Sequence, residues 1–159
     1  MTVCIEKSIW IAASPEAVFD AYCSPDSALR WLGALLTIEP RVGGPYAVDM
    51  GTMGVVDGTI REIERPHLLH HTSGDVGDTS GSLVQLTFAG EAGGTRLLLR
   101  HDGVAEGGAE RIWDHHLARL AIVAGGGIPG PDFAQLGWSE EAVGLGYFTT
   151  WLEGCEDEA

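Results

Sequence analysis

The most constraining feature of this sequence is the stretch of residues 9–21, where a strand-like run leads directly into a helix start. Residues 2–12 mix polar with β-branched side chains, which is typical of a strand. Ser14 then precedes Pro15 and Glu16, so an N-cap, a first-turn proline and an acid near the positive end of the helix dipole follow one another. The sequence therefore predicts a strand that runs straight into a short helix.

The same helix-start signal recurs a few residues later. Ser24 precedes Pro25 and Asp26, which predicts a second short helix. This helix carries Trp31, and Gly33 ends it, because glycine readily adopts the left-handed backbone of a helix C-terminus. We therefore expect two short helices after the first strand.

The central part of the chain contains only strand patterns separated by turns. Glycines and prolines mark tight turns, and apolar residues alternate along segments such as residues 83–88. One strand is predicted to run without interruption over residues 55–64, and the polar, glycine-rich residues 73–81 predict a loop. Strands joined by such short turns pair in antiparallel order, so we expect a curved antiparallel sheet of about six or seven strands.

A long amphipathic helix is predicted over residues 110–124. Its apolar side chains recur at helical spacing and form one stripe, made of Trp113, His116, Leu117, Leu120 and Val123. The glycines and prolines of residues 125–131 end this helix. We therefore divide the chain into a folded domain, residues 1–124, and a tail, residues 125–159, with a linker, a further helix over residues 139–152 and an acidic end.

Charge and cysteine content limit the classes of partner. The formal net charge of −14 is large for 159 residues and opposes binding to nucleic acid or to an anionic membrane surface. Cys4, Cys23 and Cys155 are far apart and odd in number, which favours free thiols in a reducing compartment. No leader segment or membrane-spanning apolar run is apparent in the sequence. We expect a cytoplasmic, acidic, single-domain protein.

The ordered set of motifs resembles the START-related helix-grip (SRPBCC) superfamily, and within it the bacterial group related to the activator of Hsp90 ATPase. An I-x-A-x-P-E-x-V-F-x-A motif is met by Ile11, Ala13, Pro15, Glu16, Val18, Phe19 and Ala21. A tryptophan in the second helix, a G-G-x-Y turn and a G-x-I-x-E-I-x-x-P strand are met by Trp31, by Gly43, Gly44 and Tyr46, and by Gly58, Ile60, Glu62, Ile63 and Pro66. The last strand and helix motifs, G-T-x-L-x-L-x-H-x-G and W-x-x-x-L-x-x-L, are met by Gly94, Thr95, Leu97, Leu99, His101, Gly103, Trp113, Leu117 and Leu120.

This resemblance implies an α+β helix-grip fold, in which the curved sheet wraps around the long C-terminal helix and leaves a cavity between them. The superfamily includes lipid and hormone binders, aromatase/cyclase-like enzymes and co-chaperones, so the fold alone does not define an activity. The favoured hypothesis is binding of a small hydrophobic or aromatic ligand in that cavity. A cyclase- or hydrolase-like enzyme in the same cavity and a co-chaperone-like interaction module remain as alternatives, and a homodimer through the C-terminal helix is a further expectation.

The candidate ligand-binding residues are the inward-facing side chains of the predicted sheet and helices. They are Trp31, Tyr46, Val48, Ile60, Val84, Leu86, Phe88, Leu97, Leu99, His101, Trp113, His116 and Leu117. His101 is the best polar candidate, because alternation places it on the same strand face as Leu97 and Leu99. The competing interpretation is a structural histidine that hydrogen-bonds the adjacent helix.

The remaining histidines and acids do not form a recognisable catalytic or metal site. Neighbouring residues of a strand face opposite sides, and His67 and His71 would lie about 13 Å apart by strand rise. His115 and His116 are consecutive on a helix and point in different directions. No nucleophile, zinc-ligand or phosphate-cradling motif occurs. We expect no metal, no cofactor and no catalytic set.

Overall fold

The computed structural model describes residues 2–51, 54–74, 82–105 and 109–130 of the chain, and the described residues up to Pro129 form one compact unit. Strand β1 (Thr2–Ile11) leads into helices α1 (Pro15–Cys23) and α2 (Pro25–Trp31). The later elements are β2 (Leu35–Ile38), β3 (Tyr46–Asp49), β4 (Val55–Val56), β5 (Ile60–Glu64), β6 (Leu68–Ser73), β7 (Ser82–Glu91), β8 (Gly94–Ala105) and α3 (Ala109–Ala124). The predicted α+β helix-grip fold is confirmed.

The two predicted helix starts are confirmed by their capping contacts. The Ser14 hydroxyl oxygen accepts a hydrogen bond from the Ala17 amide at 3.2 Å, and the Ser24 hydroxyl caps α2 in the same way. Gly33 adopts a φ of 69° after α2, where its amide donates to the Ala28 carbonyl. Local sequence signals therefore determine where both short helices begin and end.

The strands form two sheets rather than the single sheet that the sequence predicts. The larger is a five-stranded antiparallel sheet of order β1-β8-β7-β6-β5, and the smaller is a three-stranded sheet of order β2-β3-β4. The predicted continuous strand over residues 55–64 is interrupted between β4 and β5. A side chain at Gly58 would collide with the backbone carbonyls of Thr72 and Tyr46, so only glycine lets the chain pass this closely between β3 and β6.

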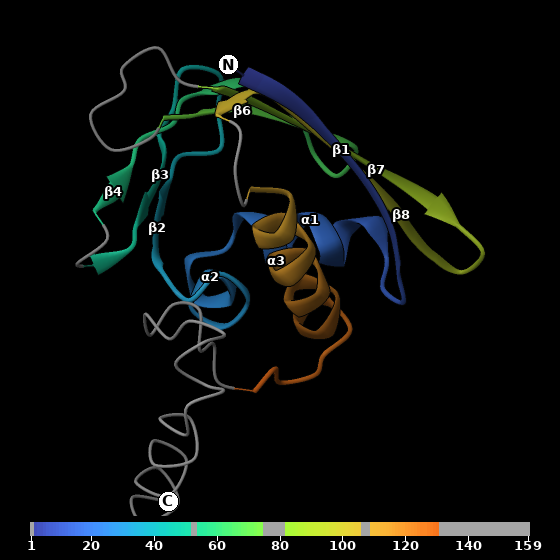
Figure 1. The fold of residues 1–159 in the computed structure, drawn as a ribbon. Helices are drawn as coiled ribbons and strands as arrows, with labels where there is room; N and C mark the ends of the chain where they lie inside the picture. The colour runs from blue at the N-terminus through green and yellow to red at the C-terminus, as the bar shows by residue number, and fades with distance from the viewer. Residues whose placement is uncertain (1, 52–53, 75–81, 106–108, 131–159) are drawn as a thin grey trace, which may run out of the picture. The chain divides into compact units, whose positions relative to one another are not determined.

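The helices cover the inner face of the larger sheet, which arches over α1 and α3 (Figure 1). The inward residues of β7 and β8 alternate with outward ones, and Leu86, Phe88 and Leu97 are almost completely buried. Phe88 contacts Phe19 of α1 edge to face, with ring centroids 5.2 Å apart. The smaller sheet stands beside α2 in the same view. This arrangement gives the molecule two neighbouring inner regions, one under the larger sheet and one between the two sheets.

Helix α3 forms ion pairs with β1 and ends where the sequence predicts. The Lys7 ammonium lies 2.9 Å from the Glu110 carboxylate and 3.0 Å from that of Asp114. Beyond α3, Gly126 adopts a φ of 87° and its amide donates to the Val123 carbonyl. Among the described residues, no helix is long and apolar enough to cross a membrane. The predicted helix over residues 139–152, the acidic end of the chain and most of the predicted loop over residues 73–81 lie outside the described residues.

Candidate functional site

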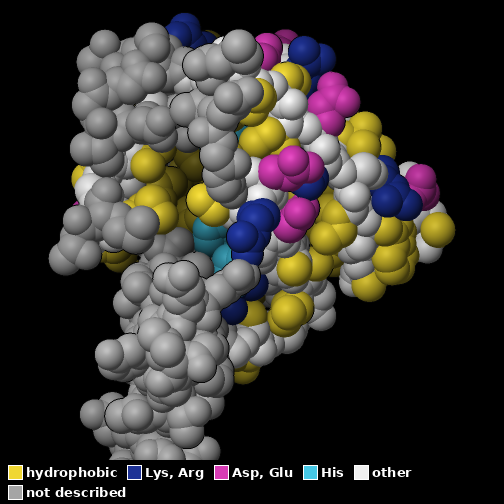
Figure 2. Space-filling view, in the orientation of Figure 1, with side chains coloured by type: hydrophobic (Ala, Val, Ile, Leu, Met, Phe, Trp, Pro, Cys, Tyr) yellow, Lys and Arg dark blue, Asp and Glu magenta, His cyan; other side chains and the backbone are white. Residues whose placement is uncertain are grey.

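A cavity of about 200 Å³ lies between the two sheets and the N-terminal half of α3. Hydrophobic side chains line a hollow on this side of the molecule, and histidine side chains show at its edge (Figure 2). The lining combines apolar, aromatic and imidazole groups: Tyr22, Trp31, Leu32, Tyr46, Val48, Met50, Val56, His71, Ser73, His101, Val104, Ala109, Ile112, Trp113 and His116. None of these described residues carries a permanent charge, so the cavity suits an uncharged, largely apolar molecule.

The structure brings part of the predicted ligand-binding set together in this cavity. The residues that line it are Trp31, Tyr46, Val48, His101, Trp113 and His116. The others are buried in the hydrophobic core and are not among its lining residues: Ile60, Val84, Leu86, Phe88, Leu97, Leu99 and Leu117. The reason is packing, because side chains of α1 and α3, such as Phe19 and Leu120, fill the space under that part of the sheet.

Sequence reasoning missed the polar centre of the cavity, which is formed by Tyr22 and His71. The Tyr22 hydroxyl lies 2.8 Å from His71 Nε2, and His71 Nδ1 lies 2.9 Å from the Thr72 carbonyl oxygen. A carbonyl only accepts, so His71 carries its proton on Nδ1, and Nε2 accepts the hydrogen bond that Tyr22 donates. The Tyr46 ring stacks on the imidazole, with centroids 4.0 Å apart and an interplanar angle of 20°.

Burial keeps this centre uncharged. Removal from water lowers the pKa of His71 to about 4, with neighbouring histidines opposing a positive charge as smaller causes. The same desolvation raises the pKa of both the Tyr22 and the Tyr46 hydroxyls. Near neutral pH, two phenols and a neutral imidazole therefore face one another in the cavity wall. The Tyr46 hydroxyl donates to the Tyr22 backbone carbonyl at 3.3 Å.

The register of β6 explains why His71 escaped notice. Residues 68–73 read Leu-Leu-His-His-Thr-Ser, which shows no clear alternation of apolar and polar side chains. Pairing with β7 places His71 opposite Val84 and Leu69 opposite Leu86, so these side chains face inward. His70 faces outward, where Nδ1 lies 3.1 Å from the Glu62 carboxylate. The predicted opposite orientation of neighbouring histidines is confirmed, and only strand pairing selects which one is buried.

His101 lines the cavity and also bonds the adjacent helix, which is the contact that the structural interpretation of this residue predicts. The Trp113 indole N–H donates to His101 Nδ1 at 2.9 Å. Because Nδ1 accepts, the neutral ring carries its proton on Nε2, which donates to the Ser82 hydroxyl, and Ser82 donates to the Ser73 carbonyl at 2.7 Å. This direction of hydrogen bonding does not activate Ser82, because a nucleophilic serine must donate its proton to the histidine.

Trp31 and His116 close the cavity where α2 meets α3. The Trp31 indole donates to the Ala21 carbonyl at 3.0 Å, and His116 Nδ1 lies 3.3 Å from the Trp31 carbonyl oxygen. The Trp31 and His116 rings meet edge to face, with centroids 6.3 Å apart. Within the described ranges, no group of three or more histidine, cysteine, aspartate or glutamate side chains has an arrangement that could hold a metal ion. The polar groups at this end of the cavity are thus engaged in hydrogen bonds and ring contacts within the protein.

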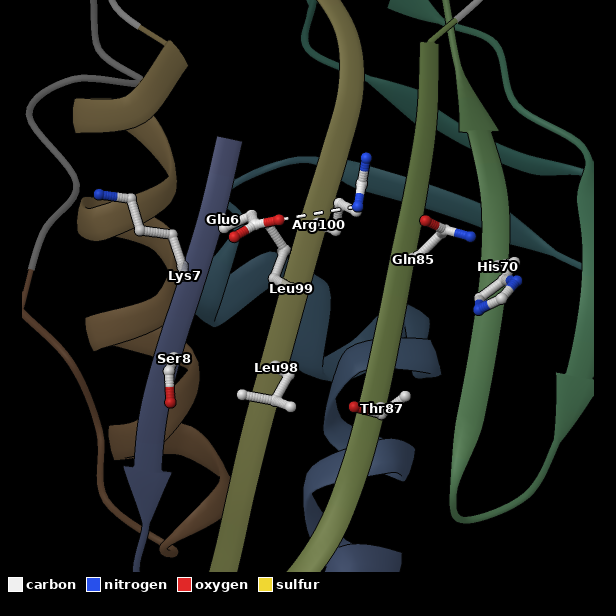
Figure 3. A pocket seen from close by; sticks show the side chains of 9 residues that line it. All are labelled: Glu6, Lys7, Ser8, His70, Gln85, Thr87, Leu98, Leu99 and Arg100. Atoms are coloured by element: carbon white, nitrogen blue, oxygen red, sulfur yellow. Dashed lines mark ion pairs between the residues drawn. The ribbon is translucent and has the colours of Figure 1, made fainter. Parts of the chain in front are cut away.

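A second, larger depression of about 520 Å³ lies on the outer face of the larger sheet. Its side chains stand on β1, β8, β7 and β6, and Arg100 lies 3.7 Å from the Glu6 carboxylate (Figure 3). Its lining also includes Gln85, Thr87 and Leu98, and Leu98 is 49% exposed. These groups stand on a sheet face that is open to water. The inner cavity is smaller, but its apolar and aromatic lining makes it the better candidate for a ligand site.

The fold and cavity define a class of protein: a helix-grip domain with a largely apolar cavity beside its last helix. The chain belongs to the activator of Hsp90 ATPase homolog 1-like protein family, whose sequence profile matches residues 12–125. Among curated proteins, none matches the sequence.

Solved structures with the same fold agree with this family. An AHSA1-like protein from Rhizobium etli is 34% identical, with a TM-score of 0.67 over 83% of this chain and 88% of that one. An Hsp90 activator from Plasmodium falciparum is 23% identical, with a TM-score of 0.65 over 79% of this chain and 97% of that one. The Aha1 dimer from Colwellia psychrerythraea is 19% identical, with a TM-score of 0.65 over 79% of this chain and 99% of that one. At these lower identities the likeness is one of fold.

Proposed function

We propose that this protein binds a small hydrophobic or aromatic molecule in the cavity between the two sheets and α3. The observation that carries the proposal is the composition of the cavity wall, in which apolar and aromatic side chains surround a few neutral polar groups. Such walls are typical of ligand sites, because apolar area supplies affinity and a few polar groups orient the ligand. The volume of about 200 Å³ matches a ligand of one or two rings better than a long lipid.

The hydrogen bonds of the cavity favour binding over catalysis. His101 is the predicted acid–base candidate, yet both of its ring nitrogens are engaged by Trp113 and Ser82. His71 is held neutral by burial, with a pKa of about 4, and its Nε2 accepts from Tyr22. A general acid or base exchanges a proton with its substrate through a ring nitrogen at a pKa near the working pH. The low pKa of His71 and the two hydrogen bonds of His101 oppose this role.

Charge and cysteine content define the rest of the proposal. A net charge of −14 disfavours nucleic acid and anionic membrane surfaces as partners. Cys4 and Cys23 are free, which is consistent with the reducing cytoplasm. The division into a binding domain, residues 1–124, and a separate tail stays a proposal. Dimerisation through the C-terminal segment stays a prediction, because residues 131–159 lie outside the described residues.

The test is a thermal-shift screen of small aromatic and aliphatic compounds, followed by two variants of β4. Val56 lines the cavity, whereas its neighbour Val55 is 42% exposed on the opposite face of the strand. We expect Val56→Phe to occupy part of the cavity and to weaken binding of a hit at least tenfold. Val55→Phe adds the same ring outside the cavity and should leave the affinity within twofold.

Two results would contradict the proposal. The first is a hit that binds equally well to wild type and to Val56→Phe, which would place the ligand elsewhere. The second is the absence of any thermal shift across the screen. That result would turn attention to the co-chaperone-like alternative, tested by asking whether the protein stimulates the ATPase of the host Hsp90.

A further inference from the structure

The cavity presents hydrogen-bond acceptors to its ligand, because the protein already uses the protons of its buried polar groups. Tyr22 donates to His71 Nε2, and Tyr46 donates to the Tyr22 carbonyl. A phenol that has donated its one proton retains oxygen lone pairs and can only accept further hydrogen bonds. Both residues are almost completely buried, and their two hydroxyls also interact with each other, so the remaining oxygen lone pairs are shielded from water.

Four ring N–H groups of the wall also donate their protons to acceptors within the protein. The Trp31 indole donates to the Ala21 carbonyl, and the Trp113 indole donates to His101 Nδ1. His71 Nδ1–H donates to the Thr72 carbonyl, and His101 Nε2–H donates to Ser82. Each of these protons is therefore directed at a protein acceptor rather than at the cavity.

We propose that the cavity selects an uncharged aromatic ligand that carries a hydrogen-bond donor, such as a phenolic O–H or an indole-type N–H. This inference rests on the proposed function and specifies the chemical class of its ligand. A donor on the ligand would hydrogen-bond the oxygen lone pairs of Tyr22 or Tyr46. A ligand with acceptors alone could not form a hydrogen bond with these oxygens, because neither side would supply a proton. A carboxylate would in addition lose its hydration among groups that carry no positive charge.

Three probes of nearly equal shape separate these cases. Indole carries an N–H donor, benzofuran places an acceptor oxygen at the same position, and indene has neither. Titrations followed through the tryptophan indole signals in ¹⁵N–¹H NMR spectra report on the cavity directly, because Trp31 and Trp113 both line it. We expect indole to bind at least fivefold more tightly than benzofuran and indene, and benzoate to bind more weakly than any of them.

One variant should change this preference. His71→Phe keeps an aromatic ring beside Tyr46 but removes the acceptor of the Tyr22 proton. The freed Tyr22 O–H can then donate to a ligand, so benzofuran should gain affinity relative to indole. His70→Phe is the matched control, since His70 directly precedes His71 in β6 and lies on the outer face with Glu62. This control should keep the wild-type preference.

Ser73 needs its own control, because its half-buried hydroxyl also lines the cavity and can donate or accept. Ser73→Ala should leave the preference for indole in place. Equal binding of the three probes to wild type would overturn the inference while the proposed function stands. Loss of the preference in Ser73→Ala would also overturn it, since Ser73 and not the phenols would then select the donor. If no probe and no compound of the wider screen binds, the proposed function itself fails.

Discussion

The two ends of the inner sheet face differ in how they are filled. At one end, Phe88 contacts Phe19 edge to face, and Phe19, Phe88 and Leu97 are each at most 2% exposed. At the other end, His71 and His101 from the same sheet face a cavity of about 200 Å³. One end is packed by interlocking apolar side chains, and the other keeps space and polar groups under the last helix. The packed end therefore stabilises the fold, and the open end is where we propose that a ligand binds.

The largest expected effect is at the packed end. Leu97→Ala removes a completely buried side chain and leaves a void, so we expect the free energy of unfolding to fall by about 2–5 kcal/mol in urea denaturation. The matched control is Leu98→Ala on the same strand, where 49% of the residue is exposed. The control should change stability by less than about 0.5 kcal/mol. Similar losses for the two variants would contradict the packed interior described for this end.

The next effect concerns the open end and depends on pH. The pKa of His71 is about 4 in the folded protein, because burial disfavours its charged form, and 6.5 is its ordinary value. The unfolded chain therefore binds the extra proton first, and the stability contributed by neutral His71 is complete above about pH 6.5. It is lost as the pH falls toward 4, by roughly 3 kcal/mol in the free energy of unfolding.

Urea denaturation of wild type and His71→Phe between pH 7 and pH 4 checks this prediction. The variant lacks the buried titration, so its stability should fall less over this range. His70→Phe retains His71 and should follow the wild-type pH dependence. If wild type and His71→Phe lose stability in parallel, His71 is not a buried neutral group in solution.

A smaller effect is expected from the bond that joins α3 to the sheet. Trp113→Phe keeps an aromatic ring but removes the N–H that donates to His101 Nδ1. A buried acceptor without its donor costs about 1–3 kcal/mol, which urea denaturation should detect. NMR spectra of the imidazole nitrogens should also show a smaller population of the tautomer that carries its proton on His101 Nε2. An unchanged tautomer and unchanged stability would show that this bond does not orient His101.

The smallest effect sharpens the comparison between the two ends. Val56→Phe adds a ring beside existing space, so we expect a change in the free energy of unfolding of less than about 1 kcal/mol. Val18→Phe makes the same change in α1 at a position that is completely buried in the core. That variant should lose about 1–3 kcal/mol, because an over-packed core must shift side chains and backbone. Equal losses would mean that the open end has no usable space.

Much of the fold follows from local sequence signals. Ser14 and Ser24 cap their helices as predicted, and the apolar stripe of residues 110–124 corresponds to α3. The division into two sheets did not follow, because the close approach of Gly58 to Thr72 and Tyr46 involves three separate strands or turns. A strand pattern in the sequence predicts extended backbone, but it does not specify which other strands lie next to it.

The candidate site shows the same limit. Alternation predicts the inward direction of Val48, Leu97 and His101, and the structure confirms it, since all three are buried. It does not separate the side chains that fill the core, such as Leu97, from those that line the cavity, such as Val48. That difference depends on what packs against each residue from another element.

By itself, the sequence determined the two helix starts, the inward faces of the clearly alternating strands β7 and β8, and the family, because each is encoded in short motifs along the chain. Only the tertiary structure decided that His71 is buried against Tyr22, and that Trp113 holds the proton of His101 on Nε2. These properties depend on strand register and on the distance between side chains that are far apart in sequence. Burial and hydrogen-bond direction are set by such contacts, so the chemistry of the cavity emerges only when the chain is folded.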